Sequence, residues 1–372
     1  AHTPWQSALP TERAASANFA ASMASAIDDT RKIKDAIEHD NVELVRRLLS
    51  QTNVELMERL DGDESHLYSA CRRGHAACAQ LLITHRASVD RVSTTLAQTP
   101  LFAAAYNGHL DCARLLLDAN ATVDLPSSEA VTPLYAACER GRADCAALLL
   151  AAHAAVDAPK KSGFTPLYVA CLNSRTECVQ LLLEAKAKVD CAADDGHTPL
   201  SIAAKHGKAR CVELVLDAGA AVDCCTGSGF TPLYLAGLQA NADIVGRLID
   251  AAANVNAQSN DGFTPLFAAC KAGAAECTSL LLKAGASPGL GSKTALTPLY
   301  TASSNGHAPC VSLLLDAQAE VDHVTTAGLT ALHIGSSKGT LGCVQLLLGA
   351  RAQVAKWDGG GSTPLLKACV AG

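Results

Sequence analysis

The sequence has few aromatic residues and lacks the segments that mark membrane or metal-binding proteins. Aromatic residues make up 4% of the 372 residues, and there are two tryptophans and two methionines. No apolar run reaches the 18 residues that a membrane-spanning helix needs, and no Cys-x-x-Cys pair occurs. We therefore expect no membrane insertion and no metal site. The many Ala and Leu residues favour thin helical layers over a large aromatic core.

The charge pattern and the first 30 residues add further limits. A net charge of -6 argues against nucleic-acid binding, which needs a basic stripe. Residues 1–30 form an Ala/Ser-rich extension without the apolar core of a signal peptide. We expect this extension to be disordered or helical around Asn18–Ile27, with the remnant of an organelle-targeting segment as a third interpretation.

A threonine returns every 33 residues along most of the chain. In all but one case Pro-Leu follows it, the exception being Thr330. The nine positions are Thr99, Thr132, Thr165, Thr198, Thr231, Thr264, Thr297, Thr330 and Thr363. Self-similarity at a fixed period of this length indicates stacked supersecondary repeats.

Each repeat carries local signals for two helices and a loop. Thr132 is a good N-cap, and Pro133 suits the first helical position because no donor is missed there. Gly141 should end this short helix, and a second helix should run to Leu148–Leu150. A Gly-containing loop around Ser162-Gly163 then leads to the next threonine. No repeat buries its apolar face alone, so stability depends on stacking.

The 33-residue period and the Thr-Pro-Leu motif resemble the ankyrin repeat, whose signature is T-P-L-H-x-A. The resemblance implies an all-α ankyrin-repeat solenoid of stacked helix-turn-helix repeats with hairpin loops, covering residues 31–372. We number eleven repeats, the last cut off after its first helix, and expect the natural chain to continue past residue 372. They start near residues 31, 65, 99, 132, 165, 198, 231, 264, 297, 330 and 363.

Two departures from the family pattern stand out. The usual His survives as His333, and Tyr or Phe replaces it in most repeats. The Gly that normally follows the second helix in a left-handed conformation is kept at Gly219 and Gly285. Other residues hold that position elsewhere: Arg86, Asn120, His153, Lys186, Ala252, Gln318 and Arg351. Such side chains cost on the order of 1 kcal/mol each unless they are Asn-like, so we expect a folded stack that is less stable than an idealised ankyrin array.

Thirteen of the sixteen cysteines fall at two register positions, six and thirteen residues after the threonine or its equivalent. The first set is Cys71, Cys138, Cys171, Cys270 and Cys369; the second is Cys78, Cys112, Cys145, Cys178, Cys211, Cys277, Cys310 and Cys343. A recurring slot indicates core packing, where Cys acts as a small apolar residue. Cys191, Cys224 and Cys225 should lie in loops. This usage is typical of a reducing compartment, so we expect a cytoplasmic or nuclear protein.

No catalytic constellation stands apart from the repeats. The segment Pro288–Thr294 imitates a phosphate-binding loop, but Ser292 separates the last Gly from Lys293. His75, His109 and His307 share one register position and are better explained by packing than by metal ligation. We therefore expect no enzyme activity, no cofactor and no metal.

By resemblance, ankyrin arrays bind partner proteins on a concave groove. In this register the groove positions are the residue before each Thr and the residues seven and eight after it. Across repeats five to eight they form an apolar stripe with interleaved basic residues. The candidate partner-binding residues are Phe164, Leu172, Asn173, His197, Lys205, His206, Phe230, Leu238, Gln239, Phe263 and Lys271. A competing interpretation is that the Phe rings only cover neighbouring hairpins.

We expect a monomeric, non-enzymatic scaffold that binds partner proteins. The alternative is a substrate-recruiting module of a larger enzyme assembly, such as a ubiquitin ligase or an ankyrin-repeat kinase. Repeats rich in T-P-L-Y-x-A-C look like those of SOCS-box ankyrin proteins, but this sequence contains no such box. The resemblance also implies Asn256 as a substrate for asparaginyl hydroxylation, with a plain loop hydrogen bond as the other role; most repeats carry Asp at this position.

Overall fold

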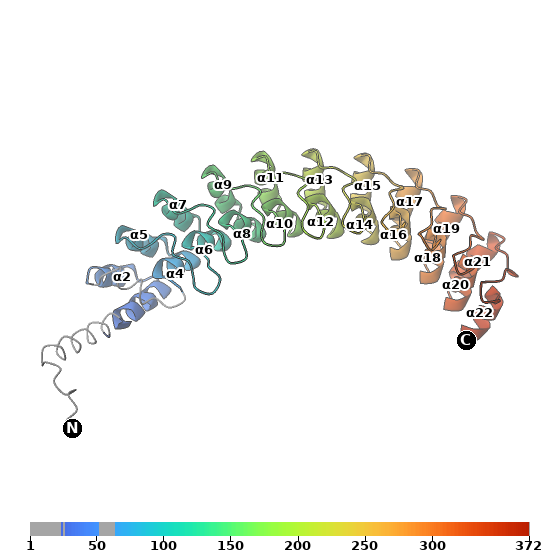
Figure 1. Cartoon of the computed structure of the whole chain (residues 1–372), viewed down its shortest axis with the longest axis horizontal. Coiled ribbons are helices and arrows are strands. Elements are labelled where there is room, and N and C mark those ends of the chain that lie inside the picture. The colour runs from blue at the N-terminus through green and yellow to red at the C-terminus, as the bar shows by residue number, and fades with distance from the viewer. Residues whose placement is uncertain (1–23, 25–26, 52–63, 372) are drawn as a thin grey trace, which may run out of the picture. The chain divides into compact units, whose positions relative to one another are not determined.

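The computed structural model describes residues 24, 27–51 and 64–371. The extension 1–30, with the expected helix Asn18–Ile27, falls largely outside these residues. The chain divides into two compact units, residues 1–161 and 162–372, which we describe separately. Every regular element in the described residues is a helix, which confirms the predicted all-α fold (Figure 1).

The helices follow the repeat register. In the first unit, residues 27–38 are helical and are followed by α2 (Val42–Leu49), α4 (His66–Arg73), α5 (Ala76–Thr84), α6 (Pro100–Asn107), α7 (Leu110–Asp118), α8 (Pro133–Arg140) and α9 (Ala143–Ala151). The second unit holds α10 (Pro166–Leu172), α11 (Thr176–Glu184), α12 (Pro199–Lys205), α13 (Ala209–Asp217), α14 (Pro232–Leu238), α15 (Ala242–Asp250), α16 (Pro265–Ala272), α17 (Ala275–Lys283), α18 (Pro298–Asn305), α19 (Ala308–Asp316), α20 (Ala331–Lys338), α21 (Leu341–Gly349) and α22 (Pro364–Ala371).

Each unit is two helices deep. First helices pack on first helices of the next repeat, as α10, α12, α14 and α16 do, and second helices form a parallel row behind them (Figure 1). The core lies between the two rows: Leu134, Cys138 and Leu149 are fully or almost fully buried in the fourth repeat. This arrangement buries the apolar faces that no single repeat covers.

The threonines cap the first helices as predicted. Thr132 Oγ1 accepts a hydrogen bond from the Tyr135 amide at 3.2 Å, Pro133 occupies the first turn, and Gly141 ends the helix with φ 72°. The same hydroxyl contact recurs from Thr99 to Thr363. At Thr330, where the Pro is missing, His333 Nδ1 also accepts from the Thr330 amide at 3.2 Å. Local capping chemistry therefore sets where each repeat begins.

The cysteine interpretation is correct with one exception. All sixteen thiols are free, and twelve of the thirteen register cysteines are buried. Cys369 is exposed on α22, which packs on α20 and is the last helix of the described residues. Thiols of adjacent repeats are hydrogen-bonded in the pairs Cys71–Cys112, Cys171–Cys211 and Cys270–Cys310. These bonds and burial raise the pKa of Cys71, Cys171 and Cys270 well above its usual value. The same bonds lower the pKa of their partners Cys112, Cys211 and Cys310, the last to about 7.

The histidines before the second helices have a packing role. His109 is the N-cap of α7, and its Nε2 lies 3.2 Å from the Arg72 carbonyl oxygen of the preceding repeat. Its ring also fills the space beside Gly74, where a Cβ would approach Nδ1 to 2.5 Å. His307 lies against Gly273 in the same way. These contacts confirm that the repeated histidines belong to the fold.

The hairpins are joined to one another along each unit. A carboxylate near the end of one repeat accepts the backbone N–H of a residue in the next, as Asp124 does from Ala155 at 3.0 Å. The same bond links Asp90 to Thr122, Asp190 to Ala221, Asp223 to Asn254 and Asp322 to Gln353. Each side-chain acceptor thereby satisfies a donor that would otherwise rely on water.

Candidate functional site

The residue before each threonine is fixed by closure of its hairpin. The Ser259 amide donates to the Phe263 carbonyl oxygen at 3.0 Å, and the Phe263 amide donates to Ser259 Oγ at 3.1 Å. Thr226 and Phe230 make the equivalent pair of bonds at 3.0 and 3.2 Å. Both phenylalanines are consequently held beside the start of the first helix in a defined position.

The hairpin phenylalanines stack on an aromatic residue of their own repeat. The ring centroids of Phe164 and Tyr168 are 4.5 Å apart, and those of Phe230 and Tyr234 are 4.4 Å apart. The Phe263 and Phe267 rings lie 4.5 Å apart and are tilted by 34°. The inner partner is buried in each pair, whereas the Phe ring is half-buried. The aromatic residue that replaces the usual His therefore supports the Phe from below.

Three of the predicted site residues meet on one patch. Phe230, Leu238 and Phe263 all pack against a buried cluster of Tyr234, Leu235 and Ala268. The patch spans the boundary between α14 and α16, which pack directly on each other. Phe230, Leu238 and Phe263 thus cover residues of the first helices α14 and α16, and both interpretations of the Phe rings stay predictions.

The sixth repeat carries a polar group at the same place. His197 is buried, its Nδ1 lies 3.0 Å from Ser201 Oγ, and Lys205 Nζ lies 3.4 Å from its Nε2. Burial lowers the pKa of His197, and the neighbouring Lys205 charge lowers it further, while Asp195 opposes the shift. His197 is thus held as a neutral side chain near pH 7.

The remaining predicted residues lie at the ends of the first helices. Asn173, His206 and Gln239 are the C-cap residues of α10, α12 and α14, and Leu172 ends α10. Lys271 is exposed in the last turn of α16. We call the surface formed by the eleven predicted residues the hairpin face. All of them lie in the second unit.

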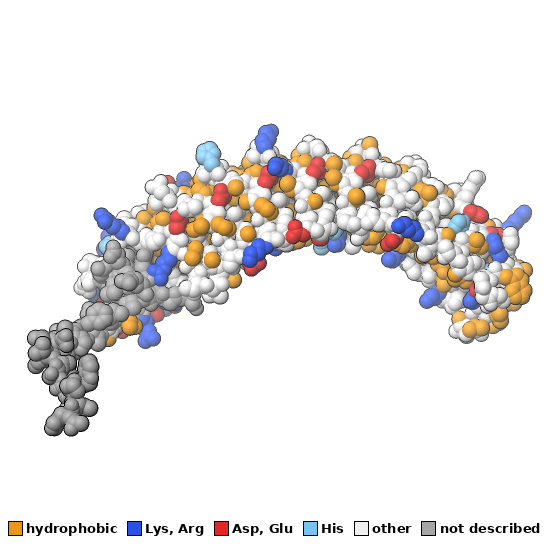
Figure 2. All heavy atoms as spheres, viewed as in Figure 1, with side chains coloured by type: hydrophobic (Ala, Val, Ile, Leu, Met, Phe, Trp, Pro, Cys, Tyr) orange, Lys and Arg blue, Asp and Glu red, His pale blue; other side chains and the backbone are white. Residues whose placement is uncertain are grey.

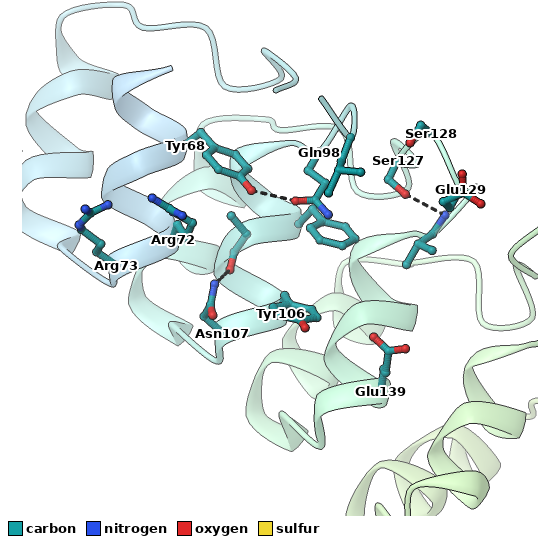
Figure 3. A pocket seen from close by; sticks show the side chains of 14 residues that line it. Tyr68, Arg72, Arg73, Gln98, Tyr106, Asn107, Ser127, Ser128, Glu129 and Glu139 are labelled. Carbon is teal, nitrogen blue, oxygen red and sulfur yellow. Dashed lines mark hydrogen bonds between the residues drawn. The ribbon is translucent and has the colours of Figure 1, made fainter. Parts of the chain in front are cut away.

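The first unit holds a pocket that the sequence analysis did not single out. Its volume is about 670 Å³, and it lies over the ends of α4, α6 and α8 and the hairpins before α6 and α8 (Figure 3). Seven of the fourteen lining residues occupy groove positions: Arg72, Arg73, Gln98, Tyr106, Asn107, Val131 and Glu139. The register rule thus identifies the wall of the pocket, although our predicted stripe lay elsewhere.

Contacts within this pocket fix most of its side chains. Tyr68 Oη donates to Gln98 Oε1 at 2.8 Å, and the two side chains point toward each other in Figure 3. Phe102 stacks on Tyr106 with centroids 6.0 Å apart, and the Arg140 guanidinium lies 4.8 Å from the Tyr106 centroid. This stacking runs along one helix, so it differs from the hairpin-to-helix stacking of the second unit.

Asn256 bridges two repeats. Its Oδ1 accepts from the Ser287 amide at 2.8 Å, and its Nδ2 donates to the Gly285 carbonyl oxygen at 3.3 Å. The first bond is the one that Asp forms in the other repeats. The hydrogen-bonding role is therefore present, and the hydroxylation that the resemblance implies stays a prediction.

The described ranges contain no group of three or more His, Cys, Asp or Glu side chains placed to hold a metal ion. No helix within them has the length and apolar character needed to cross a membrane. Figure 2 shows charged side chains of both signs scattered over the visible face, with apolar side chains gathered where the second unit carries α21 and α22.

Comparison with known proteins identifies the family. The model of the ankyrin repeats (3 copies) matches residues 33–127, 121–193, 185–259 and 239–325. No curated protein matches the chain. Among solved structures, the crystal structure of the human ASB11 ankyrin repeat domain is similar, with 27% identity and a TM-score of 0.55. That match covers 60% of this chain and 99% of the ASB11 chain.

The chain therefore belongs to the ankyrin repeat family, as the Thr-Pro-Leu motif predicted. Ankyrin repeats generally mediate protein–protein interaction, and the fold is typically a non-catalytic binding module. Because 578 solved chains match, the likeness identifies the fold and leaves the partner to be inferred from the surface.

Proposed function

We propose that this protein is a non-enzymatic scaffold that binds a partner protein along the hairpin face. The observation that supports the proposal is the row of half-buried rings at Phe164, Phe230 and Phe263, each held rigidly on a buried aromatic residue. Rigid aromatic side chains flanked by charge have the composition of interface cores and binding hot spots.

The triple substitution Phe164→Ala, Phe230→Ala and Phe263→Ala tests this function. Each ring has one face against the fold, so we expect a stability loss of about 1–2 kcal/mol per site, below the 3–5 kcal/mol of a fully buried Phe. We expect the wild-type chain to retain partner proteins from a cell extract and the triple variant to lose them. The capture is done at a temperature at which circular dichroism shows that the variant is folded.

Leu341→Ala with Leu348→Ala provides the matched control. Both leucines are exposed on α21, away from the hairpin face, with 67% and 45% of their surface accessible. This control should retain every partner. Retention of the same proteins by the folded Phe triple variant would contradict the proposed binding face, while the ankyrin fold would stand.

The second candidate function is substrate recruitment within a larger enzyme assembly. The T-P-L-Y-x-A-C repeats, which look like those of SOCS-box ankyrin proteins, support it. The test is the complete coding sequence of the natural gene. A box that binds a ligase adaptor, or kinase motifs, would favour this function; a capping repeat followed by a stop codon would favour the scaffold alone.

Hydroxylation of Asn256 is a separate proposal that rests on the family resemblance. Mass spectrometry of the protein from its natural cell should find the peptide containing Asn256 heavier by one oxygen. An unmodified peptide in every preparation would leave the inter-repeat hydrogen bonds as the whole role of this residue.

A further inference from the structure

The sixth repeat interrupts the aromatic row of the hairpin face. Repeats five, seven and eight carry a stacked aromatic pair at the residue before the Thr and three after it. The sixth repeat has His197 and Ser201 at these positions, joined by a 3.0 Å contact. Its first helix α12 packs between α10 and α14, so the polar pair lies between the Phe164 and Phe230 repeats.

The hydrogen bonds around Ser201 determine how His197 faces Lys205. Ser201 Oγ donates to the Thr198 carbonyl oxygen at 3.1 Å and accepts from the Thr198 amide at 2.9 Å. Its only hydrogen is thereby used, so Ser201 Oγ accepts from His197 Nδ1–H. The Nε2 atom then carries the lone pair and accepts from the Lys205 ammonium at 3.4 Å. His197 thus positions Lys205 without neutralising it.

Lys205 forms no ion pair with an acidic side chain in the part of the chain that the structure describes. Among residues 162–371, no Asp or Glu side chain forms an ion pair with Lys205 or Lys208. The nearby Asp195 carboxylate instead accepts from the His197 backbone amide at 3.0 Å. One of the three ammonium donors of Lys205 bonds His197, which leaves two for a ligand. A half-buried cation between apolar rings is matched by an anion from a partner.

We infer that Lys205 is a carboxylate-recognising position on the hairpin face and that the occupant is an extended acidic–apolar peptide segment of the partner protein. Its Asp or Glu side chain bonds Lys205, and its apolar side chains lie against Phe164 on one side and against Phe230 and Phe263 on the other. This inference rests on the proposed function. The site contains Lys and His without an Arg fork, so a carboxylate fits better than a phosphate, which Arg binds in bidentate fashion.

The spacing of the repeats predicts the conformation of the segment. Packed helices lie about 8–10 Å apart, which sets the distance between successive hairpin positions. A polyproline II helix has about three residues per turn and a rise of about 3.1 Å per residue, so every third side chain returns to the same face after about 9 Å. A β-strand would instead turn its third side chain to the opposite face. The expected pattern is therefore apolar-x-x-acidic-x-x-apolar-x-x-apolar in polyproline II conformation.

The experiment uses a random 16-residue peptide library displayed on phage and selected on the full chain. Each selected peptide is then tested on wild type and on the double variant Phe230→Ala with Phe263→Ala. Peptides that bind wild type but not the double variant are called dependent peptides. Among the dependent peptides we expect Asp or Glu three residues from an apolar residue. Binding should fall about tenfold with Lys205→Gln and recover with Lys205→Arg. Lys186→Gln, at an exposed site after α11, is the matched control and should change nothing.

The outcomes separate this inference from the proposed function. Dependent peptides without an acidic residue, or bound equally well by Lys205→Gln, would overturn the role of Lys205 and leave the hairpin face as the binding surface. An absence of peptides that depend on the two Phe residues would count against both. Thermal melting of the Lys205 variants within about 2 °C of wild type shows that the readout is binding. Raising NaCl from 50 to 500 mM should weaken wild type more than Lys205→Gln, because the contact is ionic.

Discussion

At the scale of single residues, backbone strain is found at the position that follows the second helices. Seven non-glycine residues occupy the left-handed position that follows them, including His153 at φ 62° and Ala252 at φ 62°. Gly219 and Gly285 hold the same position at φ 85° and 87°. L-residues pay for this conformation with contacts between Cβ and the backbone. The strain predicted from the sequence is therefore present at each substituted position.

We expect Ala252→Gly to stabilise the protein by about 1 kcal/mol and Gly219→Ala to destabilise it by a similar amount, measured by urea unfolding. A Cβ on Gly219 would meet nothing within 4 Å, so the loss isolates the effect of φ. Gly246→Ala is the control: it lies within α15 with equal space and should stabilise by about 0.5–1 kcal/mol. A neutral Gly219→Ala would contradict the strain argument.

His197 makes stability depend on pH. Its pKa in the folded protein is below the ordinary 6.5, because of burial and Lys205, so the unfolded state binds more protons between these values. The contribution of neutral His197 to the free energy of unfolding is complete above about pH 6.5. It is lost as the pH falls toward the pKa of His197 in the folded protein. His197→Phe with Ser201→Tyr, which rebuilds the aromatic pair of the fifth repeat, should lose less stability between pH 7.5 and 5.5 than wild type. If the double variant loses as much stability as wild type between these pH values, the loss is due to titratable groups other than His197.

At the scale of the elements, local chemistry made the helix starts predictable. Thr132 and Pro133 determine the N-terminus of α8 through contacts within four residues. The threonine cap repeats at every motif, and the Pro repeats at every motif except that of Thr330. The contact of His197 with Lys205, and the pocket beside Tyr106, depend on how a hairpin folds back over the end of a helix. That geometry involves residues eight or more apart and is absent from the local pattern. The register of these residues was therefore predictable, whereas their contacts were not.

The hairpin bridges between repeats have a measurable effect. Asn256→Ala removes the acceptor of the Ser287 amide and should cost about 1 kcal/mol, while Asn256→Asp restores the acceptor used elsewhere and should cost less than about 0.5 kcal/mol. The midpoint of urea unfolding distinguishes them. Equal losses would mean that the Nδ2 bond to Gly285 dominates.

At the scale of the whole molecule, the last described helix lacks a neighbour on one side. Leu365 of α22 is 73% exposed, whereas its counterparts in inner repeats, such as Leu200 and Leu266, are fully buried. We expect the Cys369 amide to exchange hydrogen faster than the equivalent Ala204 amide of α12 by at least a hundredfold, because α22 opens without disturbing the stack. Equal protection measured by mass spectrometry or NMR would contradict this.

The carboxylate-to-amide bonds between hairpins also bear on how such a chain changes length. Each bond joins an acceptor in one repeat to a donor at the same register in the next, as from Asp190 to Ala221 and from Asp223 to Asn254. Excision of a 33-residue block, wherever its ends are placed, leaves the flanking acceptor and donor in register to meet again. Gene duplication or loss in whole repeats thus preserves these bonds, whereas a single-residue insertion in a helix changes the spacing between the acceptor and the donor of the bond that spans it. The composition of the hairpin face can in this way change one repeat at a time. Loss of residues 197–229 would remove His197 and Lys205 and place Phe164 and Phe230 in successive repeats.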